Sequence, residues 1–284
     1  MHVTDTEQLE WRTVAVNART GEVQNKYIRE GEILPGVGYA SDCYNYVGGA
    51  NPFTAPRHRH DFEQIRISMT GDQDFGNGQV TEEGWIAYFP AAAYYGPEFI
   101  NGASIFQIQW SDHWVSRSLH ESTYAELSKT GRFEGGKYVT VGPDGEEHTR
   151  DALNAIWEHV YKRPSSFPPA RYPQPVLMNP DAFEYQRLDD AISTKVLGRF
   201  TERDITITKI RWDETAAWTL SADRTYCVFT TTGDIVVGDQ EYGSHTVVWS
   251  DWGDADQIVG QRGAEALCIA FQTINFAPDL SDRA

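Results

Sequence analysis

Three short apolar segments occur twice along this chain in the same order, and this repeat most narrows the folds that the chain can adopt. The matching pairs are residues 64–71 with 226–233, 84–90 with 243–249, and 105–109 with 267–271. Alternation of apolar and polar residues is typical of half-buried strands, and matching strands in a fixed order indicate a duplicated β unit. We therefore expect a mainly all-β chain of two similar barrels.

Short alternating runs broken by Gly, Asn and Asp predict the individual strands. The expected strands are residues 12–16, 38–46, 64–69, 85–89, 104–110, 205–212, 226–232, 235–237, 246–249 and 266–272. Between the two groups, apolar residues recur at intervals of three and four over 152–161, which predicts a helix. A second short helix is expected over 118–128.

The proline-rich run 163–175 cannot form a regular helix or a central strand, because proline lacks the amide donor and fixes φ. We interpret this run as a linker between domains. The expected division is an N-terminal barrel over 1–117, a helical insert and linker over 118–175, and a C-terminal barrel over 176–284.

Two histidines, His58 and His60, stand just before the strand that begins at Gln64. An extended backbone projects both imidazoles to the same side, because side chains alternate along a strand. Both rings can then meet one small object, and the usual object is a divalent metal. The alternative is a pair of solvated histidines at a basic strand edge, since Arg57 and Arg59 flank them.

The spacing of these residues resembles the two motifs of cupins. His58-x-His60, three residues, Gln64, six residues and Gly71 is similar to His-x-His, three or four residues, Glu, six residues, Gly. Gly84, five residues and Pro90, followed by residues 91–95, is similar to Gly, five residues, Pro-x-Gly-x-x-His. The whole chain resembles a bicupin with two jelly-roll barrels, although the resemblance does not cover the insert over about 118–162.

The resemblance implies a metal site formed by His58, His60, Gln64 and Tyr95. This chain has Gln64 where the family has glutamate and Tyr95 where it has histidine. Loss of the carboxylate lowers affinity for a hard dication, whereas a phenolate at Tyr95 restores negative charge. Fe(II) is the expected metal, with Zn(II), Ni(II) and Mn(II) as alternatives. The other interpretation is a barrel that kept its histidines for hydrogen bonds to substrate.

Glu63 does not replace the missing carboxylate, because strand alternation points it away from the side that Gln64 faces. The second barrel has no comparable set. The repeat places Leu220 and Ala222 at the positions of the two histidines, and Asp254 at the position of Tyr95. We therefore expect the C-terminal barrel to lack metal ligands.

Arg66 alternates with Gln64, so it is expected to point inward and bind a carboxylate or an enolate. We assign catalytic roles to Arg66 and Tyr95. Gln107 and Gln109 share one face of an alternating strand, and they either line a pocket or face water.

Three aromatic residues near this site have two interpretations. They either form a wall for an apolar or ring-bearing substrate or pack in the core. These residues are Trp85, Tyr88 and Trp110.

The net charge of the chain limits the kinds of partner that it can bind. A formal net charge of −17 argues against nucleic acid or an anionic membrane surface, since both need a basic face. There is neither an apolar stretch of membrane-spanning length nor a secretory signal, and the three cysteines show no CxxC spacing. We expect a cytoplasmic protein with a small-molecule substrate, and exposed edge strands allow a homodimer.

Three functions remain open. The first is an oxidoreductase, because bicupins with one working barrel include dioxygenases; Fe(II) would bind O2 and a hydroxylated substrate. The second is a lyase, isomerase or cyclase, in which a metal acts as Lewis acid on a carbonyl and Tyr95 is the acid or base. The third is a ligand-binding bicupin without catalysis, because a fold alone does not establish an activity. The resemblance favours the dioxygenase.

Overall fold

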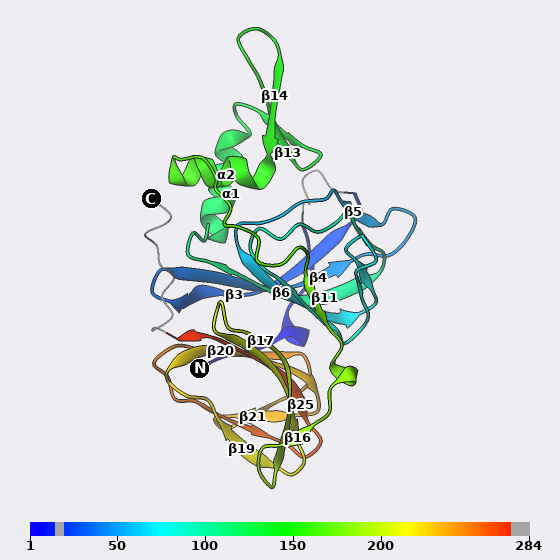
Figure 1. Ribbon diagram of the computed structural model, residues 1–284, viewed down its shortest axis with the longest axis vertical. Coiled ribbons are helices and arrows are strands. Elements are labelled where there is room, and N and C mark those ends of the chain that lie inside the picture. Colours follow the sequence, from blue (N-terminus) through cyan, green and yellow to red (C-terminus); the bar gives the residue numbers. More distant parts are fainter. Residues whose placement is uncertain (15–19, 274–284) are drawn as a thin grey trace. The chain divides into compact units, whose positions relative to one another are not determined.

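The computed structural model describes residues 1–14 and 20–273, and the chain divides into two compact units. The N-terminal unit contains Trp11–Gly31 and Gly36–Leu177, and the C-terminal unit contains Met1–Glu10, Glu32–Pro35 and the chain from Met178 onward. Figure 1 shows strands throughout both units. The expected fold class, mainly all-β with two jelly-roll barrels and a short helical insert, is confirmed.

The N-terminal unit is a barrel of two sheets. Its large sheet has seven strands in the order β15-β9-β6-β11-β4-β3-β2, and its small sheet has four in the order β5-β10-β7-β8. The large sheet contains β2 (Arg12–Val14), β3 (Val23–Leu34), β4 (Val37–Tyr46), β6 (Glu63–Thr70), β9 (Ile86–Phe89), β11 (Ala103–Ser111) and β15 (Val176–Met178). The small sheet contains β5 (Phe53–Ala55), β7 (Gln73–Asp74), β8 (Val80–Thr81) and β10 (Glu98–Ile100).

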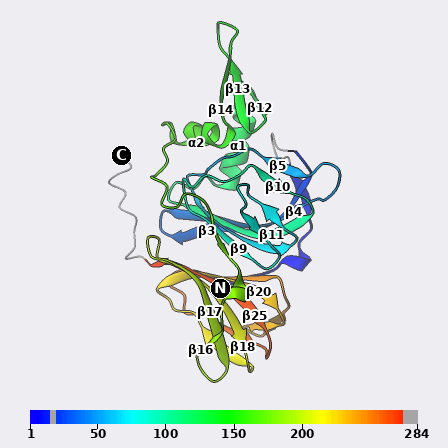
Figure 2. The same cartoon turned by 45° about the vertical axis from the view of Figure 1, so that its right-hand side comes forward.

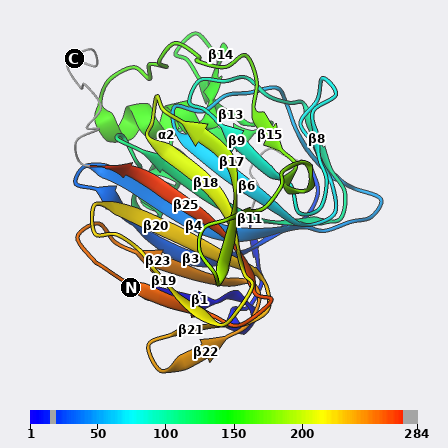
Figure 3. The ribbon, with the colours of Figure 1, turned by 60° about the horizontal axis from the view of Figure 1, so that its bottom comes forward.

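The C-terminal unit has the same construction, with a seven-stranded sheet β1-β23-β20-β25-β18-β17-β16 and a four-stranded sheet β19-β24-β21-β22 (Figure 3). The large sheet contains β1 (His2–Asp5), β16 (Gln186–Arg187), β17 (Ile192–Phe200), β18 (Ile205–Trp212), β20 (Arg224–Thr232), β23 (Thr246–Ser250) and β25 (Glu265–Thr273). The small sheet contains β19 (Ala216–Thr219), β21 (Ile235–Val237), β22 (Gln240–Tyr242) and β24 (Gln257–Gly260). Two 3-10 turns, η1 (Thr6–Gln8) and η2 (Pro180–Ala182), follow β1 and β15.

The repeated segments of the sequence occupy equivalent places in the two sheets. The order β9-β6-β11-β4 in one unit corresponds to β23-β20-β25-β18 in the other. These strands are within one or two residues of the expected ranges, because each has a clear alternating pattern. The expected strand over 12–16 is β2, Arg12–Val14, and its last two residues lie outside the described chain.

The compact units differ from the expected division at their outer strands. β1 lies within the range expected for the N-terminal barrel, yet it pairs with β23, with His2 opposite Trp249. β15 begins within the range expected for the C-terminal barrel, yet it lies beside β9. Each large sheet is therefore completed by a strand from the other half of the chain. Strands of three or four residues show too little alternation to reveal this exchange.

The helical insert of the N-terminal unit contains α1 (Arg117–Leu127), α2 (Ala152–Tyr161) and a small sheet, β12 (Arg132–Glu134), β13 (Lys137–Val141) and β14 (Glu147–Asp151). Figure 2 shows this sheet projecting beyond the two helices. Ser116 and Asp151 cap the helices, because their side chains accept from the backbone N of Leu119 and Asn154. No helix of the described chain is long and apolar enough to cross a membrane.

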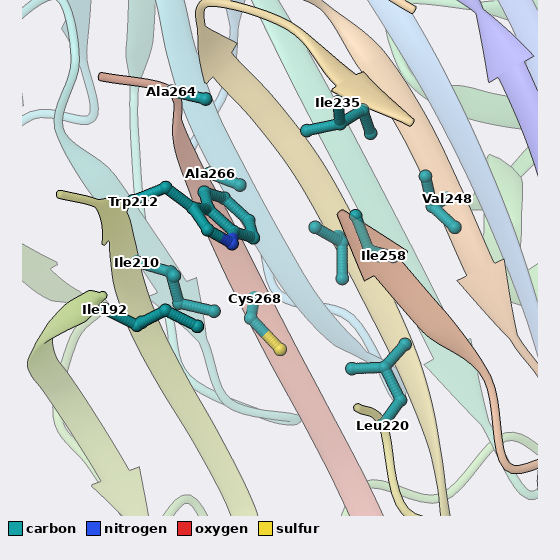
Figure 4. Close-up of a cluster of buried hydrophobic side chains, with 11 residues drawn as sticks. Ile192, Ile210, Trp212, Leu220, Ile235, Val248, Ile258, Ala264, Ala266 and Cys268 are labelled. Atoms are coloured by element: carbon teal, nitrogen blue, oxygen red, sulfur yellow. The ribbon is translucent and has the colours of Figure 1, made fainter. Parts of the chain in front are cut away.

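Apolar side chains fill the interior of the C-terminal barrel. Figure 4 shows Trp212 among branched aliphatic residues, and Leu220 belongs to the same buried cluster. The Trp212 ring packs on backbone, because a Cβ built on Gly260 would lie 2.0 Å from the ring atom Cδ2. Glycine at this position therefore makes room for the indole.

We predict that Gly260→Ala destabilises the chain by about 1–3 kcal/mol, because the added methyl group overpacks the core against Trp212. Gly243→Ala is the matched control, since its nearest neighbour would be Asp234 Oδ1 at 3.6 Å, an ordinary contact. The urea midpoint of each variant measures the effect. Equal midpoints for the two variants would contradict this account of the core.

Candidate functional site in the N-terminal barrel

β6 presents two rows of side chains to opposite sides of the large sheet, because side chains alternate along a strand. Arg66 faces the small sheet, where its Nη1 donates to Glu98 of β10 at 2.6 Å. Ser68, on the same row, accepts at its Oγ from Gln73 Nε2 of β7 at 2.7 Å. Gln64 precedes Arg66 by two positions and lies on this row. The row of Gln64 and Arg66 therefore faces the barrel interior, as alternation predicts.

Gln107 and Gln109 of β11 lie on the same inner face. Their register partners on β6 are Arg66 and Gln64. The side-chain amides of Gln109 and Gln64 approach each other to 2.7 Å, and Gln107 is buried. Both glutamines therefore lie on the side of the large sheet that carries Arg66.

Tyr88 and Trp110 lie on the opposite face of the large sheet, together with Glu63. The Tyr88 hydroxyl donates to Glu63 Oε2 at 2.7 Å, and the Tyr88 and Trp110 rings stack with centroids 6.5 Å apart. The alternation that turns Glu63 away from the Gln64 side also turns these two rings away. They therefore lie on the face of the sheet opposite to Gln64.

Trp85 also lies away from the histidines. Its carbonyl accepts from the backbone N of Ser68, at the far end of β6 from Gln64. Ser68 is four positions along the strand from Gln64, a span of about 13 Å. Of the five residues expected to bind substrate, Gln107 and Gln109 lie nearest to Gln64, because their register partners on β6 are Arg66 and Gln64.

The two motifs of the resemblance meet at His58 and Tyr95. The backbone N of each residue donates to the carbonyl of the other at 3.0 Å. Their ring centroids lie 4.4 Å apart, and the His58 and His60 centroids lie 4.9 Å apart. The His60 ring stacks on Phe62 at 4.3 Å. The structure therefore brings together the two histidines and the tyrosine that the sequence singled out.

The contacts of His58 fix which ring nitrogen carries a proton. Nδ1 lies 2.7 Å from the carbonyl oxygen of Pro56, and a carbonyl only accepts, so Nδ1 is the protonated nitrogen. Nε2 of the same ring lies 3.7 Å from Glu98 Oε2. The His58 side chain is 13% exposed and that of Glu98 is 1% exposed, so His58 lies at the more accessible end of this pair.

The Arg66 guanidinium is surrounded by polar groups and aromatic rings. Besides Glu98, it contacts the Tyr95 hydroxyl, 3.5 Å from Nη2. The Gln64 amide satisfies its hydrogen bonds best with its oxygen toward Arg66. In this orientation the oxygen accepts from Arg66 Nε at 2.6 Å. The Phe89 ring centroid lies 4.9 Å from the guanidinium carbon. Burial lowers the pKa of Arg66, but the charge and hydrogen bond of Glu98 outweigh burial and raise that pKa above its ordinary value.

Two of the four metal ligands implied by the resemblance lie against a guanidinium. Gln64 and Tyr95 both contact Arg66, so two of the four interact with a fixed cation. Within residues 1–14 and 20–273, no three His, Cys, Asp or Glu side chains are grouped so that they could hold a metal ion. A guanidinium also repels a dication placed beside it. These donors therefore do not fit the expected metal centre.

A second buried carboxyl, Asp42 of β4, also faces the interior and was not expected from the sequence. It is the register partner of Gln107. Asn25 Nδ2 donates to its Oδ1 at 3.3 Å, and Arg117 Nη1 of α1 lies 3.8 Å away. Burial raises the pKa of Asp42 to about 7, with Arg117 lowering it and Glu30 raising it. The signal that could have found Asp42 is its inward position in the alternation of residues 38–46.

Comparison with known proteins identifies the fold. No protein-family model matches the chain, and no curated protein matches it. A candidate dioxygenase from Nostoc punctiforme is 11% identical over 98% of this chain and 84% of its own, with a TM-score of 0.60. Bacillus subtilis oxalate decarboxylase, a protein with Mn(II) centres, is 11% identical over 95% and 77%, with a TM-score of 0.53. The protein YlbA of E. coli is 8% identical over 95% and 90%, with a TM-score of 0.54.

At this level of identity the similarity shows the fold alone. The chain has the bicupin fold, with two cupin-type barrels, which confirms the fold that the sequence motifs implied.

We predict that Arg66→Met lowers the free energy of unfolding by about 3–5 kcal/mol, because it leaves the buried Glu98 carboxylate without the guanidinium. The double variant Arg66→Met/Glu98→Gln is expected to recover more than half of this loss. Urea unfolding measures both. Arg187→Met, which breaks an exposed pair with Asp190, is the control and is expected to cost less than about 1 kcal/mol. Additive effects of the two interior substitutions would contradict a direct pair.

Asp42 is expected to make stability depend on pH. The folded chain keeps the Asp42 proton until about pH 7, whereas the unfolded chain loses it near 3.8, so this stabilisation is lost as pH rises between these values. Relative to Asp42→Asn, the wild-type chain should lose about 2–3 kcal/mol between pH 5 and pH 8. Urea unfolding at both pH values tests this, with the exposed Asp72→Asn as control. A constant difference between wild type and Asp42→Asn would refute it.

Proposed function

We propose that this bicupin-fold chain is an enzyme whose N-terminal barrel carries out proton transfer as a lyase, isomerase or cyclase. Its substrate is a small organic molecule with hydroxyl or carbonyl groups. One observation supports the proposal above the others: the buried Arg66 cation contacts the Tyr95 hydroxyl, and the His58 ring lies 4.4 Å from the Tyr95 ring. A base, an acid and a fixed positive charge are thus next to one another.

Each group has a distinct role in this proposal. His58 Nε2 is the nitrogen that gains and loses a proton, because Nδ1 keeps its proton on the Pro56 carbonyl. Tyr95 donates its hydroxyl proton to the substrate oxygen that receives the electron pair. Arg66, 3.5 Å from that hydroxyl, stabilises the phenolate that remains. The proton taken from the substrate and the proton given to it therefore balance.

The residues around these groups indicate the class of substrate. The amides of Gln64, Gln107 and Gln109 both donate and accept hydrogen bonds, which suits hydroxyl and carbonyl groups. At the rim, the guanidinium carbons of Arg57 and Arg59 each lie 4.8 Å from the Tyr94 ring centroid. Two arginines flanking His58 in a chain of net charge −17 favour an anionic substrate, such as a carboxylic acid.

A second candidate function is a metal-dependent oxidoreductase of the dioxygenase type, with Fe(II), or Zn(II), Ni(II) or Mn(II), held near His58 and His60. Its support is the fold, which is shared with a candidate dioxygenase and with the Mn(II) protein oxalate decarboxylase. The engagement of Gln64 and Tyr95 by Arg66 argues against it. The metal content of the purified chain separates the candidates, since about one ion per chain would favour this second function.

We predict that the wild-type chain in D2O incorporates deuterium at carbon in at least one hydroxy- or oxo-carboxylic acid, as measured by mass spectrometry. Tyr95→Phe should lower this exchange rate by about 100-fold or more, because the proton donor is lost. Tyr242→Phe, in the C-terminal barrel, is the matched control and should leave the rate unchanged. An unaltered rate in Tyr95→Phe would rule out this tyrosine as the proton donor, and absence of exchange with every acid would contradict the substrate class.

A further inference from the structure

We propose that Gln107, Asp42 and Tyr44 form a second end of the substrate site in the N-terminal barrel, and that this end binds a hydroxyl group of the substrate. The inference rests on the proposed function, which places the reacting part of the substrate beside Tyr95 and Arg66. It narrows the substrate class to organic acids that carry a hydroxyl group away from the reacting carbon.

The proposed second end lies on the inner face of the large sheet. Gln107 of β11 has Arg66 of β6 as its register partner on one side and Asp42 of β4 on the other, so these three form one row across neighbouring strands. Tyr44 follows Asp42 by two positions on β4 and therefore points to the same side. Its ring packs against the buried cluster that contains Phe53 of the small sheet, which places it in the barrel interior.

Polar atoms of Gln107, Asp42 and Tyr44 have no partner in the described chain. Within residues 1–14 and 20–273, neither the Gln107 side-chain amide nor the Tyr44 hydroxyl makes a hydrogen bond to another group of the chain. The one side-chain hydrogen bond to the Asp42 carboxyl in these residues comes from Asn25 and goes to Oδ1, which leaves Oδ2 available.

The burial of these groups makes their free polar atoms significant. Gln107 and Asp42 are 5% and 7% exposed, whereas Tyr44 is partly exposed and connects this end of the interior to solvent. Buried polar groups in proteins nearly always have a hydrogen-bond partner. Three neighbouring groups with free donors and acceptors are therefore best explained by a ligand that pairs with them.

The donors and acceptors at this end match a hydroxyl group. The Gln107 amide both donates and accepts, and the ionised Asp42 carboxylate accepts. Burial and the negative charge of Asp42 raise the pKa of Tyr44, so its phenol keeps its proton and donates. A hydroxyl is a neutral group that donates one hydrogen bond and accepts two, so it can pair with all three side chains.

The charges around Asp42 disfavour a charged group at this end. Glu30 of β3 adds a negative charge that raises the pKa of Asp42, so a carboxylate of the substrate would be repelled. Arg117 of α1 already supplies a positive charge, because its Nη1 lies 3.8 Å from Asp42 Oδ1. A neutral group therefore fits better than a second acid or an ammonium.

The test is binding of matched pairs of hydroxy acids to the full chain, measured by isothermal titration calorimetry. The pairs are glycerate with lactate, threonate with 2-hydroxybutanoate, and gluconate with 2-hydroxyhexanoate. Only the first acid of each pair has hydroxyl groups beyond the carbon next to the carboxylate. In one or more pairs, the wild-type chain should bind the first acid at least about tenfold more tightly, because the other leaves buried polar groups unpaired.

Tyr44→Phe removes the proposed donor and should reduce this preference to about threefold or less. Because the hydroxyl has no partner in the described chain, its loss should leave the urea midpoint unchanged, whereas a purely structural role would lower it. Gln107→Met should also reduce the preference, and it decides the question if Tyr44→Phe does not fold. Tyr242→Phe, in the C-terminal barrel, is the control and should keep the preference.

The outcomes separate this inference from the proposed function. Equal binding within every pair, or no binding of any of the six acids, overturns the inference, and so does a preference that every folded variant retains. In each of these cases deuterium exchange in the wild-type chain still decides the proposed function. A preference that is lost in folded Tyr44→Phe or Gln107→Met supports the inference; if no acid then exchanges deuterium, the proposed reaction alone is contradicted.

Discussion

The buried ion pair between Arg66 and Glu98 joins the two sheets of the N-terminal barrel and organises the groups around it. Arg66 comes from β6 of the large sheet and Glu98 from β10 of the small sheet. Removing two charges from water is costly, and an apolar pair of similar volume would often serve stability equally well. Such a pair is better explained by what it does to its neighbours: it holds the Gln64 oxygen, contacts the Tyr95 hydroxyl and places a carboxylate beside His58.

The C-terminal barrel has the same arrangement of strands but no counterpart of Arg66 and Glu98 in its apolar core cluster. Its sheets have the same strand order, yet Trp212 and aliphatic residues fill the interior that glutamines and charged residues occupy in the N-terminal barrel. The Leu220 side chain, at the position that the repeat equates with His58, is part of this apolar cluster. The difference between the barrels therefore lies in side chains pointing inward from equivalent strands, which is why the bicupin fold alone does not define an activity.

Much of this arrangement follows from alternation in the sequence. Alternation placed Gln64 and Arg66 on the inner face and Glu63 on the outer one, and the structure agrees. Alternation does not reveal Glu98, because it stands in a strand of three residues, too short for a pattern, and its partner is 32 positions away. The inward carboxyl of Asp42 required knowledge of which face of β4 is covered. Residue type alone leaves open which face Tyr88 and Trp110 occupy, whereas their register places them opposite Ile65 and Glu63.

The central claim is that a guanidinium, rather than a metal, is the cation of this barrel. Anomalous diffraction from crystals soaked in Mn(II) tests it most directly, because it locates the ion and the arginine in one experiment. The account predicts no anomalous peak in the N-terminal barrel and an Arg66 guanidinium in contact with Glu98. A peak between the rings of His58 and His60, with Arg66 turned away from Glu98, would contradict it.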